Sequence, residues 1–331
     1  MWLVAKLPSL VVAAITLAAV ALTGCEAPTS APPVTLRIGV YTAQDYLPYY
    51  AMEEQGLDKK YGLKFTEIPV AGGAAAIDAI ANGTMDAALA GIVPVLAAAE
   101  RGLFPEKIVA VAANNFADLE HRGAGVLVAA AVHSWKDLEG KKIGTNARNS
   151  ILTAAAVARL KQEGVSGYSF LEIPLPNLGL ALAGGNVAAA VMNEPYITQS
   201  MLRGDGKLLD WVIGGPPFEK MEVSTIVFSA DFRRHNPNGV KAFLRAHLAA
   251  VRWVNDHPDT ARLVLAKRLN LSEEVVRKIN LLRWPADART DRAQLEQTQQ
   301  VLLGANVLQR PTDARRIHDE TLLAEVLKEA R

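Results

Sequence analysis

The sequence contains a single cysteine, Cys25, among its 331 residues. Disulfides and cysteine–zinc sites need more than one thiol, so neither is expected. The six histidines show no HxH or HExxH spacing, and we expect no metal site and no cofactor. The formal net charge is only +1, so the chain has no basic field that would attract nucleic acid.

Cys25 directly follows an apolar run. Residues 7–22 carry no charge, and Lys6 precedes them. A run of this length is short for a membrane-spanning helix and typical of a secretion signal. Leu22-Thr23-Gly24-Cys25 resembles the lipobox of bacterial lipoproteins, whose cysteine is acylated and becomes the first residue after cleavage. The resemblance implies a signal peptide over residues 1–24 and lipidation of Cys25; a plain cysteine in a signal-anchor helix is the alternative.

Cleavage and acylation would have three consequences. The lost segment holds one lysine and no acid, so the mature chain has no net charge. No free thiol remains for catalysis. Residues 25–33 are small, polar and proline-rich, and we expect them to form a flexible tether. The mature protein is then expected in the cell envelope, on the periplasmic or extracytoplasmic face of a bilayer, anchored by acyl chains.

From Val34 the chain alternates short β-rich runs with helical runs, which predicts an α/β domain with mostly parallel strands. Strands are expected over residues 35–40, 63–68, 86–90, 107–113, 125–131, 142–145, 169–173, 187–192, 208–213 and 223–229. Helices between them are expected over 74–82, 93–101 and 151–163. A wholly helical tail is expected to follow, with helices over 240–256, 260–269, 272–281, 293–303 and 313–328.

About 300 residues exceed what one hydrophobic core usually holds, so two lobes are expected. The β-rich stretches near 119–125 and 222–226 lie where the chain would cross between them. The first lobe would comprise residues 34–120 and 225–331, and the second lobe residues 121–224.

Several segments, in consistent order, resemble one protein family. They are residues 48–57, Tyr61-Gly62-Leu63, Gly72-Gly73, residues 77–86, residues 137–144, Asn193-Glu194-Pro195 and Phe232. They resemble the solute-binding proteins of ABC importers for nitrate, sulfonates, taurine and thiamine-pyrimidine precursors. The resemblance implies a two-lobed type II periplasmic-binding fold, with two crossovers between the lobes and a ligand held in the cleft. It also implies an ABC permease in the membrane as partner, and we expect a monomer.

Polar and small residues follow the expected strands of the first lobe, where ligands of open α/β sheets bind. The candidate ligand-binding residues there are Tyr41, Gln44, Asp45, Gly72, Gly73, Gly91 and Asn114. Glycines before a helix let a ligand approach free N–H groups. The alternative for each residue is an ordinary turn.

In the second lobe the candidates are Asn146, Arg148, Asn149, Ser150, Asn193, Glu194 and Tyr196. Arg148 stands near a helix start and is suited to a bidentate grip on a carboxylate, sulfonate or phosphate, so Arg148→Ala is expected to weaken binding. Asn149 serves alternatively as a helix N-cap, and Arg148 as a solvated side chain. Glu194 would accept an N–H from the ligand or merely cap a helix.

The sequence therefore predicts a binding protein rather than an enzyme. The expected ligand is a small organic anion, namely a sulfonate, a carboxylate or a heteroaromatic compound. A ligand sensor without transport is one alternative. The other is an enzyme of pyrimidine or menaquinone biosynthesis on the same fold, but those relatives resemble cytoplasmic proteins or carry a cysteine-rich motif.

Overall fold

The computed structural model describes residues 32–329 of the chain. The expected signal peptide, Cys25 and most of the tether lie outside these residues. Within them, no helix combines the length and the apolar character that crossing a membrane requires. Residues from Pro33 onward belong to one compact unit, and both sheets described below lie in it.

The described residues form ten strands, and helices lie between most of them. The strands are β1 (Val34–Val40), β2 (Leu63–Pro69), β3 (Ala87–Gly91), β4 (Ile108–Ala117), β5 (Ala124–Val128), β6 (Lys142–Thr145), β7 (Ser169–Glu172), β8 (Ala189–Asn193), β9 (Lys207–Ile213) and β10 (Met221–Ser229). The helices of the first part are η1 (Gln44–Tyr46), α1 (Leu47–Glu54), α2 (Leu57–Lys60), α3 (Gly73–Ala81), α4 (Ile92–Glu100), η2 (Trp135–Leu138), α5 (Ile151–Gln162), η3 (Leu175–Asn177), α6 (Leu178–Ala183) and α7 (Tyr196–Arg203). Those after β10 are α8 (Ala230–His235), α9 (Pro237–Asp256), α10 (Pro258–Leu269), α11 (Glu273–Lys278), α12 (Arg292–Gly304), α13 (Ala314–Ile317) and α14 (Thr321–Glu329).

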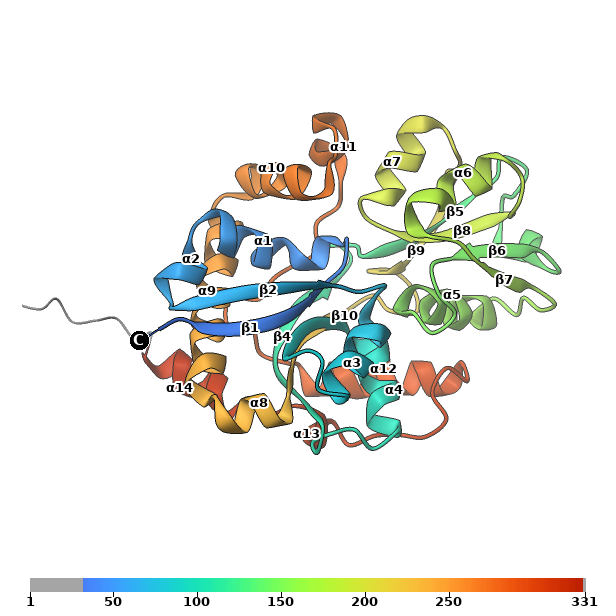
Figure 1. Cartoon of the computed structure of the whole chain (residues 1–331). Coiled ribbons are helices and arrows are strands. Elements are labelled where there is room, and N and C mark those ends of the chain that lie inside the picture. The colour runs from blue at the N-terminus through green and yellow to red at the C-terminus, as the bar shows by residue number, and fades with distance from the viewer. Residues whose placement is uncertain (1–31, 330–331) are drawn as a thin grey trace, which may run out of the picture. The chain divides into compact units, whose positions relative to one another are not determined.

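The strands form two five-stranded sheets with equivalent orders, β2-β1-β3-β10-β4 and β7-β6-β8-β5-β9. In each sheet the strand at the fourth place runs antiparallel to its neighbours: β10 pairs antiparallel with β3 and β4, and β5 with β8 and β9. The other four strands of each sheet share one direction. The expectation of mostly parallel α/β sheets is confirmed, and the two sheets define the two lobes in Figure 1.

The chain passes from the first sheet to the second between β4 and β5, and returns between β9 and β10. Both antiparallel strands therefore follow a crossover directly. Because β10 begins at Met221, residues 221–224 pair within the first sheet. The boundary between the lobes placed near residues 224 and 225 remains a prediction.

The ends of the helices have local causes in the sequence. Ser150 caps α5 by accepting a hydrogen bond from the N–H of Thr153. Gly164, with φ of 64°, lies just beyond the end of α5, where a glycine takes the left-handed conformation without a steric cost. Strands β3 and β4 are buried along their whole length. Small and β-branched residues there allow helices to cover both faces of the sheet.

The C-terminal region is helical, but one of its helices is shorter than expected. The helix expected over 272–281 is α11, which ends at Lys278; residues 279–291 are not helical, and Arg283 pairs with Phe116 of β4. The single helix expected over 313–328 is split into α13 and α14, because His318 forms a bridge with Ala110 of β4. Backbone groups of the sheet edge take precedence over local helix propensity at both places.

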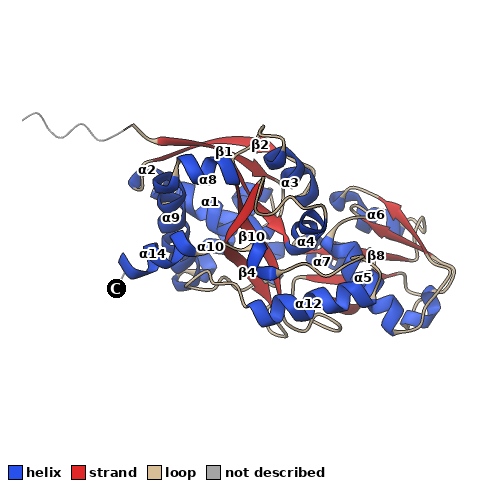
Figure 2. Ribbon diagram, turned by 90° about the horizontal axis from the view of Figure 1, so that it is seen from below, coloured by secondary structure: helices blue, strands red, loops and turns tan. Residues whose placement is uncertain are grey.

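The C-terminal helices also reach the second lobe. Helix α11 contacts α7, and α12 contacts α5. In Figure 2, α12 lies alongside α5, far from α14 at the other end of the first lobe. The tail therefore packs on both sheets rather than on the first alone.

Candidate ligand-binding cavity between the lobes

A cavity of about 380 Å³ is lined by residues of both lobes. This volume lies in the range of small-molecule sites. The lining comes from the ends of β1, β3, β6 and β8 and from the N-terminal turns of α3, α4 and α5. Three helix N-termini from two lobes therefore meet at one cavity. Each presents N–H groups that have no intrahelical acceptor.

Tyr46 holds the first-lobe wall in place. Its hydroxyl lies within hydrogen-bond distance of the carbonyl oxygens of Gly39 (2.7 Å) and Leu89 (3.1 Å), near the ends of β1 and β3. The η1 turn that carries Gln44 and Asp45 is thereby tied to both strands. Gln44 is 1% exposed and its Oε1 accepts the N–H of Leu282 at 3.2 Å, whereas its Nε2 has no partner among residues 32–329.

Asp45 is 7% exposed and lines the cavity. Its Oδ1 accepts a hydrogen bond from Nδ2 of Asn115 at 3.1 Å, and its main-chain oxygen accepts one from Nδ2 of Asn114 at 2.9 Å. Burial raises the pKa of Asp45, although hydrogen bonding by Asn115 and the nearby Ser224 opposes the rise. Tyr41 lies beside it, and burial together with the charge of Asp45 raises the pKa of Tyr41 well above its usual value. The phenol therefore stays neutral.

Glycines bring the start of α3 to the cavity. Gly72 has φ of 157° and ψ of −175°, a conformation that essentially only glycine adopts. A Cβ on Gly73 would lie 3.1 Å from the backbone nitrogen of Gly91, so α3 can approach β3 closely only without a side chain there. The first N–H groups of α3 are consequently presented to a ligand with no side chain in front of them.

A hydroxyl network shapes the second-lobe wall. Thr153 donates to the carbonyl of Ala147 (2.6 Å) and lies 2.6 Å from the hydroxyl of Thr145 and 3.2 Å from that of Ser150. These bonds fix the loop between β6 and α5. Asn146 on this loop and Asn193 at the end of β8 both line the cavity, and the buried Oδ1 of each has no partner within the described residues.

The charges at the cavity are of one sign. Among the described residues that line it, Asp45 and Asp78 are the only charged ones, and there is no lysine, arginine or histidine. Asp78 is largely exposed and pairs with Arg101 at 2.9 Å. Within residues 32–329 no group of three or more His, Cys, Asp or Glu side chains is placed to hold a metal ion.

The structure brings together most of the residues predicted from the sequence. Ten of them line the cavity: Tyr41, Gln44, Asp45, Gly72, Gly73, Gly91, Asn146, Asn149, Ser150 and Asn193. Ser150 rather than Asn149 is the N-cap of α5. Contact of these residues with a ligand remains a prediction.

Arg148 and Glu194 do not line the cavity. The side chain of Arg148 is 69% exposed and pairs with Glu172 at 3.3 Å, and its Nη2 donates to the carbonyl of Phe170. Glu194 is buried and accepts from the N–H and hydroxyl of Thr198 in α7 and from the N–H of Asn280. It therefore caps a helix, as its alternative interpretation had it.

Asn114 and Tyr196 are also placed away from the lining. Asn114 is fully buried behind Asp45, where its Nδ2 donates to the main chain of Asp45 and to Ser224. Tyr196 packs in a hydrophobic cluster of the second lobe, together with Leu178 and Met192. Its ring is occupied by core packing rather than free to stack on a ligand.

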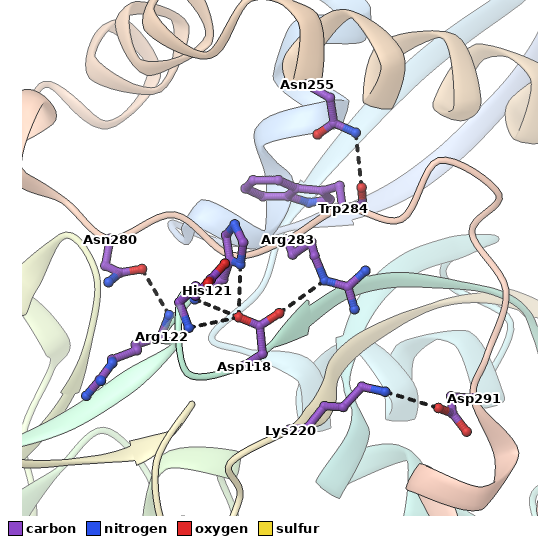
Figure 3. Close-up of polar contacts among 10 residues, drawn as sticks. Asp118, His121, Arg122, Lys220, Asn255, Asn280, Arg283, Trp284 and Asp291 are labelled. Atoms are coloured by element: carbon purple, nitrogen blue, oxygen red, sulfur yellow. Dashed lines mark hydrogen bonds and ion pairs between the residues drawn. The ribbon is translucent and has the colours of Figure 1, made fainter.

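Residues 279–284, which we call the strap, contribute a cavity residue that the sequence did not reveal. Leu282 lines the cavity, while Asn280 accepts from the N–H of Arg122 in the first crossover at 2.9 Å. Arg283 exchanges two backbone hydrogen bonds with Phe116 and donates to Asp118 (Figure 3). No local signal marks these contacts, since they join residues far apart in the chain.

Two other kinds of lining residue were missed. Asp78 lies one turn beyond Ala74 and Ala75 on α3, so helical spacing from Gly72-Gly73 could have indicated it. Apolar residues complete the wall, among them Ile151, Leu175, Ile213 and Val223. Their residue types look like ordinary core, which is why they carry no signal of a site.

A second cavity, of about 480 Å³, lies on the other side of the strap and shares Leu282 with the first. Although it is larger, several of its polar side chains already have partners: Arg283 and His121 contact Asp118, and Lys278 pairs with Glu274. None of the helix N-termini that meet at the first cavity reaches it. The first cavity is therefore the candidate site.

Comparisons with known proteins agree with this architecture. The nitrate-binding protein NrtA from Synechocystis PCC 6803 is 15% identical, with a TM-score of 0.75 over 90% of this chain and 89% of that one. The alkanesulfonate-binding protein SsuA from Xanthomonas axonopodis pv. citri, bound to MOPS, is 21% identical, with a TM-score of 0.67 over 90% and 99% of the two chains. The ligand-binding component of an ABC-type import system from Staphylococcus aureus is 14% identical, with a TM-score of 0.74 over 88% and 98%. These likenesses establish the periplasmic-binding fold.

No curated protein matches the chain in sequence. A family model does match, however, and it spans residues 29–270, which is most of the chain. It covers all the strands of both sheets and every residue of the cavity except Leu282. The chain therefore belongs to the NMT1-like family.

Proposed function

We propose that the protein is the substrate-binding component of an ABC importer and holds a small organic ligand between its two lobes. The observation that carries the proposal is that strands in the same places of the two sheets end at one cavity. Tyr41 follows β1 as Asn146 follows β6, and Gly91 ends β3 as Asn193 ends β8. Neither lobe alone encloses this space, so a ligand there would contact both and favour a closed arrangement.

The connections between the lobes suit such a closing motion. Two crossovers and the strap link the sheets, and hinge closure absorbs its backbone changes at a few positions of this kind. A permease would then distinguish the liganded from the free protein by the arrangement of the lobes. The names of the similar structures support this class, since they describe a nitrate-binding protein, an alkanesulfonate-binding protein and a component of an import system.

The cavity offers two kinds of contact to a ligand. The N-terminal turns of α3 and α5 suit a hydrogen-bond acceptor or an anionic group. Gln44, Asn146 and Asn193 have side-chain atoms with unsatisfied hydrogen bonds among the described residues. The guanidinium grip expected from Arg148 has no support from its position, so the acceptor end of the ligand would be held by backbone N–H groups.

We further propose that the protein is a membrane-anchored lipoprotein attached through Cys25. The lipobox-like residues 22–25 and the uncharged run before them support this. Cys25→Ser is expected to release or mislocalise the protein without changing ligand affinity. Unchanged localisation and processing of this variant would contradict acylation at Cys25.

The transport proposal is tested with a variant that fills the cavity. Ala75 is exposed on α3 and lines the cavity, so Ala75→Trp occupies ligand space without disturbing the core. Ala293 is an exposed residue in the first turn of α12, outside the cavity, and Ala293→Trp is the matched control. Ligands found by thermal-shift screening of a metabolite library are expected to bind the wild type and Ala293→Trp in calorimetry, and not Ala75→Trp.

A loss of uptake of the same compound by cells carrying Ala75→Trp completes the test. Binding that Ala75→Trp leaves intact would place the site elsewhere. Conversion of the compound by the purified protein, followed by mass spectrometry, would favour the enzymatic alternative. Binding without uptake would favour the sensor.

A further inference from the structure

The charge of Asp45 has no cationic partner among the residues that the structure describes. Within residues 32–329 no lysine, arginine or histidine lines the cavity beside it, and its carboxylate accepts one direct side-chain hydrogen bond, from Asn115. Two other aspartates of similar burial do have a cationic partner: Asp86 pairs with Arg37, and Asp205 with Arg203. An unpaired buried carboxylate is costly, so its presence at a ligand cavity calls for a compensating group.

Within the described part of the chain, the side chains around Asp45 supply no cationic group. The titratable side chains around it are Tyr41, Tyr46 and Tyr50, and burial raises the pKa of each. They remain neutral phenols at physiological pH. Asn115 donates one hydrogen bond to the carboxylate, Ser224 also lowers its pKa by hydrogen bonding, and Asn114 donates to the main-chain oxygen of Asp45. All these partners are neutral, so within residues 32–329 no cation offsets the charge of Asp45 where it lines the cavity.

We propose that the cavity selects small molecules that carry an amino group, with Asp45 as the anchor of that group. The other end of the same molecule, a hydrogen-bond acceptor or an anionic group, would lie at the N-terminal turns of α3 and α5, which attract negative charge. The ligand class is thus an amino compound with a separate acceptor or anionic end. This inference rests on the proposed function and narrows it, because a bare anion would meet the unpaired charge of Asp45.

The test must distinguish this proposal from a purely structural role of Asp45. In that case it would serve only to orient Asn115, and its loss would affect amino and non-amino ligands equally. Asp45→Asn preserves an oxygen that can accept from Asn115, so the turn is expected to fold normally. Asp45→Glu is the second variant; it keeps the negative charge but places the carboxylate one methylene group further from the main chain.

The test uses matched probe pairs that differ by one amino group. The mature chain is titrated by calorimetry with 4-aminobutyrate against butyrate, 2-aminoethanesulfonate against ethanesulfonate, and 4-aminopyrimidine against pyrimidine. At least one amino member is expected to bind about 10- to 100-fold more tightly than its partner, the range of a hydrogen bond to a charged group. Asp45→Asn should reduce that ratio to about one, while Asp45→Glu retains a preference for the amine.

Asp231, an exposed acid on α8, provides the control: Asp231→Asn should leave the ratio unchanged. The proposal is overturned if no amino member binds, if the non-amino members bind equally well, or if Asp45→Asn keeps the preference. Suppose that an acid without an amino group binds tightly and that Ala75→Trp abolishes this binding. That result would overturn this inference and leave the proposed function standing. Binding that Ala75→Trp does not affect would instead contradict the proposed function.

Discussion

The two lobes share one strand order but contribute different side chains to the cavity. The first lobe contributes two carboxylates, a tyrosine and glycine-lined helix ends, whereas the second contributes three amides and a hydroxyl without charge: Asn146, Asn149, Ser150 and Asn193. Topology therefore decides where the cavity lies. Under the proposed function, the side chains at equivalent strand ends decide what it binds, and both charges among the described lining residues come from the first lobe.

The lobes also differ in how deeply one edge of each sheet is buried. Strand β4, at an edge of the first sheet, is buried throughout, because the C-terminal tail covers it. Strand β9, at the equivalent edge of the second sheet, is only partly buried. The opposite edge strands, β2 and β7, are both largely exposed, so residues of buried strands and of exposed edge strands are expected to respond differently to mutation.

The largest contrast is expected between aromatic residues of the two sheets. Phe228 on β10 is fully buried and packs on Phe232 and Phe243, so Phe228→Ala should lower the free energy of unfolding by about 3–5 kcal/mol. Phe170 on β7 is only partly buried, and Phe170→Ala should cost about 1 kcal/mol. Urea unfolding measures both, and equal losses would contradict the difference between a buried strand and an exposed edge strand.

Acid is expected to weaken the first lobe through His247. This residue is 1% exposed, and burial lowers its pKa from 6.5 to about 4. Because the pKa is lower in the folded state, the neutral imidazole contributes fully to the free energy of unfolding above pH 6.5. This contribution is lost as the pH falls through 4, and the free energy of unfolding then decreases by about 3 kcal/mol. The only histidine within the second sheet's part of the chain, His133, is exposed.

His247→Leu removes this titration. Its free energy of unfolding in urea should therefore fall less than that of the wild type between pH 7 and pH 4. Identical losses in the two proteins would assign the acid sensitivity to other groups.

The strap allows the contacts between the lobes to be tested one by one. Asn280→Ala leaves the N–H of Arg122 without its acceptor, and should cost about 1–2 kcal/mol and alter ligand affinity. Lys220 and Asp291 form an exposed pair nearby (Figure 3), so Lys220→Ala should cost less than about 0.5 kcal/mol. Thermal unfolding and calorimetry compare the two, and a neutral Asn280→Ala would show that the strap does not tie the crossover.

Asp45 is expected to lower the stability of the ligand-free protein slightly. Since burial raises its pKa, the folded state prefers the protonated acid, and stability falls as the pH rises through the folded pKa. Asp45→Asn should therefore raise Tm at pH 7 and have no effect below the pKa of an unfolded aspartate, about 3.9. A lower Tm at pH 7 would show that the carboxylate is satisfied within the protein.

The smallest effect is expected for Arg148→Ala. The sequence predicts that this change weakens binding, but the side chain pairs with Glu172 at the surface. We expect unchanged ligand affinity and a stability change within about 0.5 kcal/mol. A clear loss of affinity in calorimetry would show that Arg148 moves to the ligand on closure.

The sequence predicted local features well because their causes are local. The sequence places the start of α5 at residue 151, although Ser150 rather than the expected Asn149 is its N-cap. The turn before α3 follows from Gly72-Gly73, and the wall residues from their position after strands. The sequence left both roles open where a side chain has two chemically reasonable partners. Glu194 suits a ligand or a helix end; in the structure it accepts from Thr198 of α7 and from Asn280 of the C-terminal region, and its contact with a ligand remains a prediction.

By itself, the sequence determined the class of fold, the order of strands and helices and most of the polar cavity wall, since hydrophobic periodicity and glycine positions act over a few residues. Only the tertiary structure decided that the helix expected to reach residue 281 ends at Lys278 and leads into the strap, that Leu282 lines the cavity, and that Arg148 lies outside it. These outcomes depend on hydrogen bonds and ion pairs between residues far apart in the chain. For the same reason, only the fold places Asp45 in the cavity without a cationic partner among the described residues.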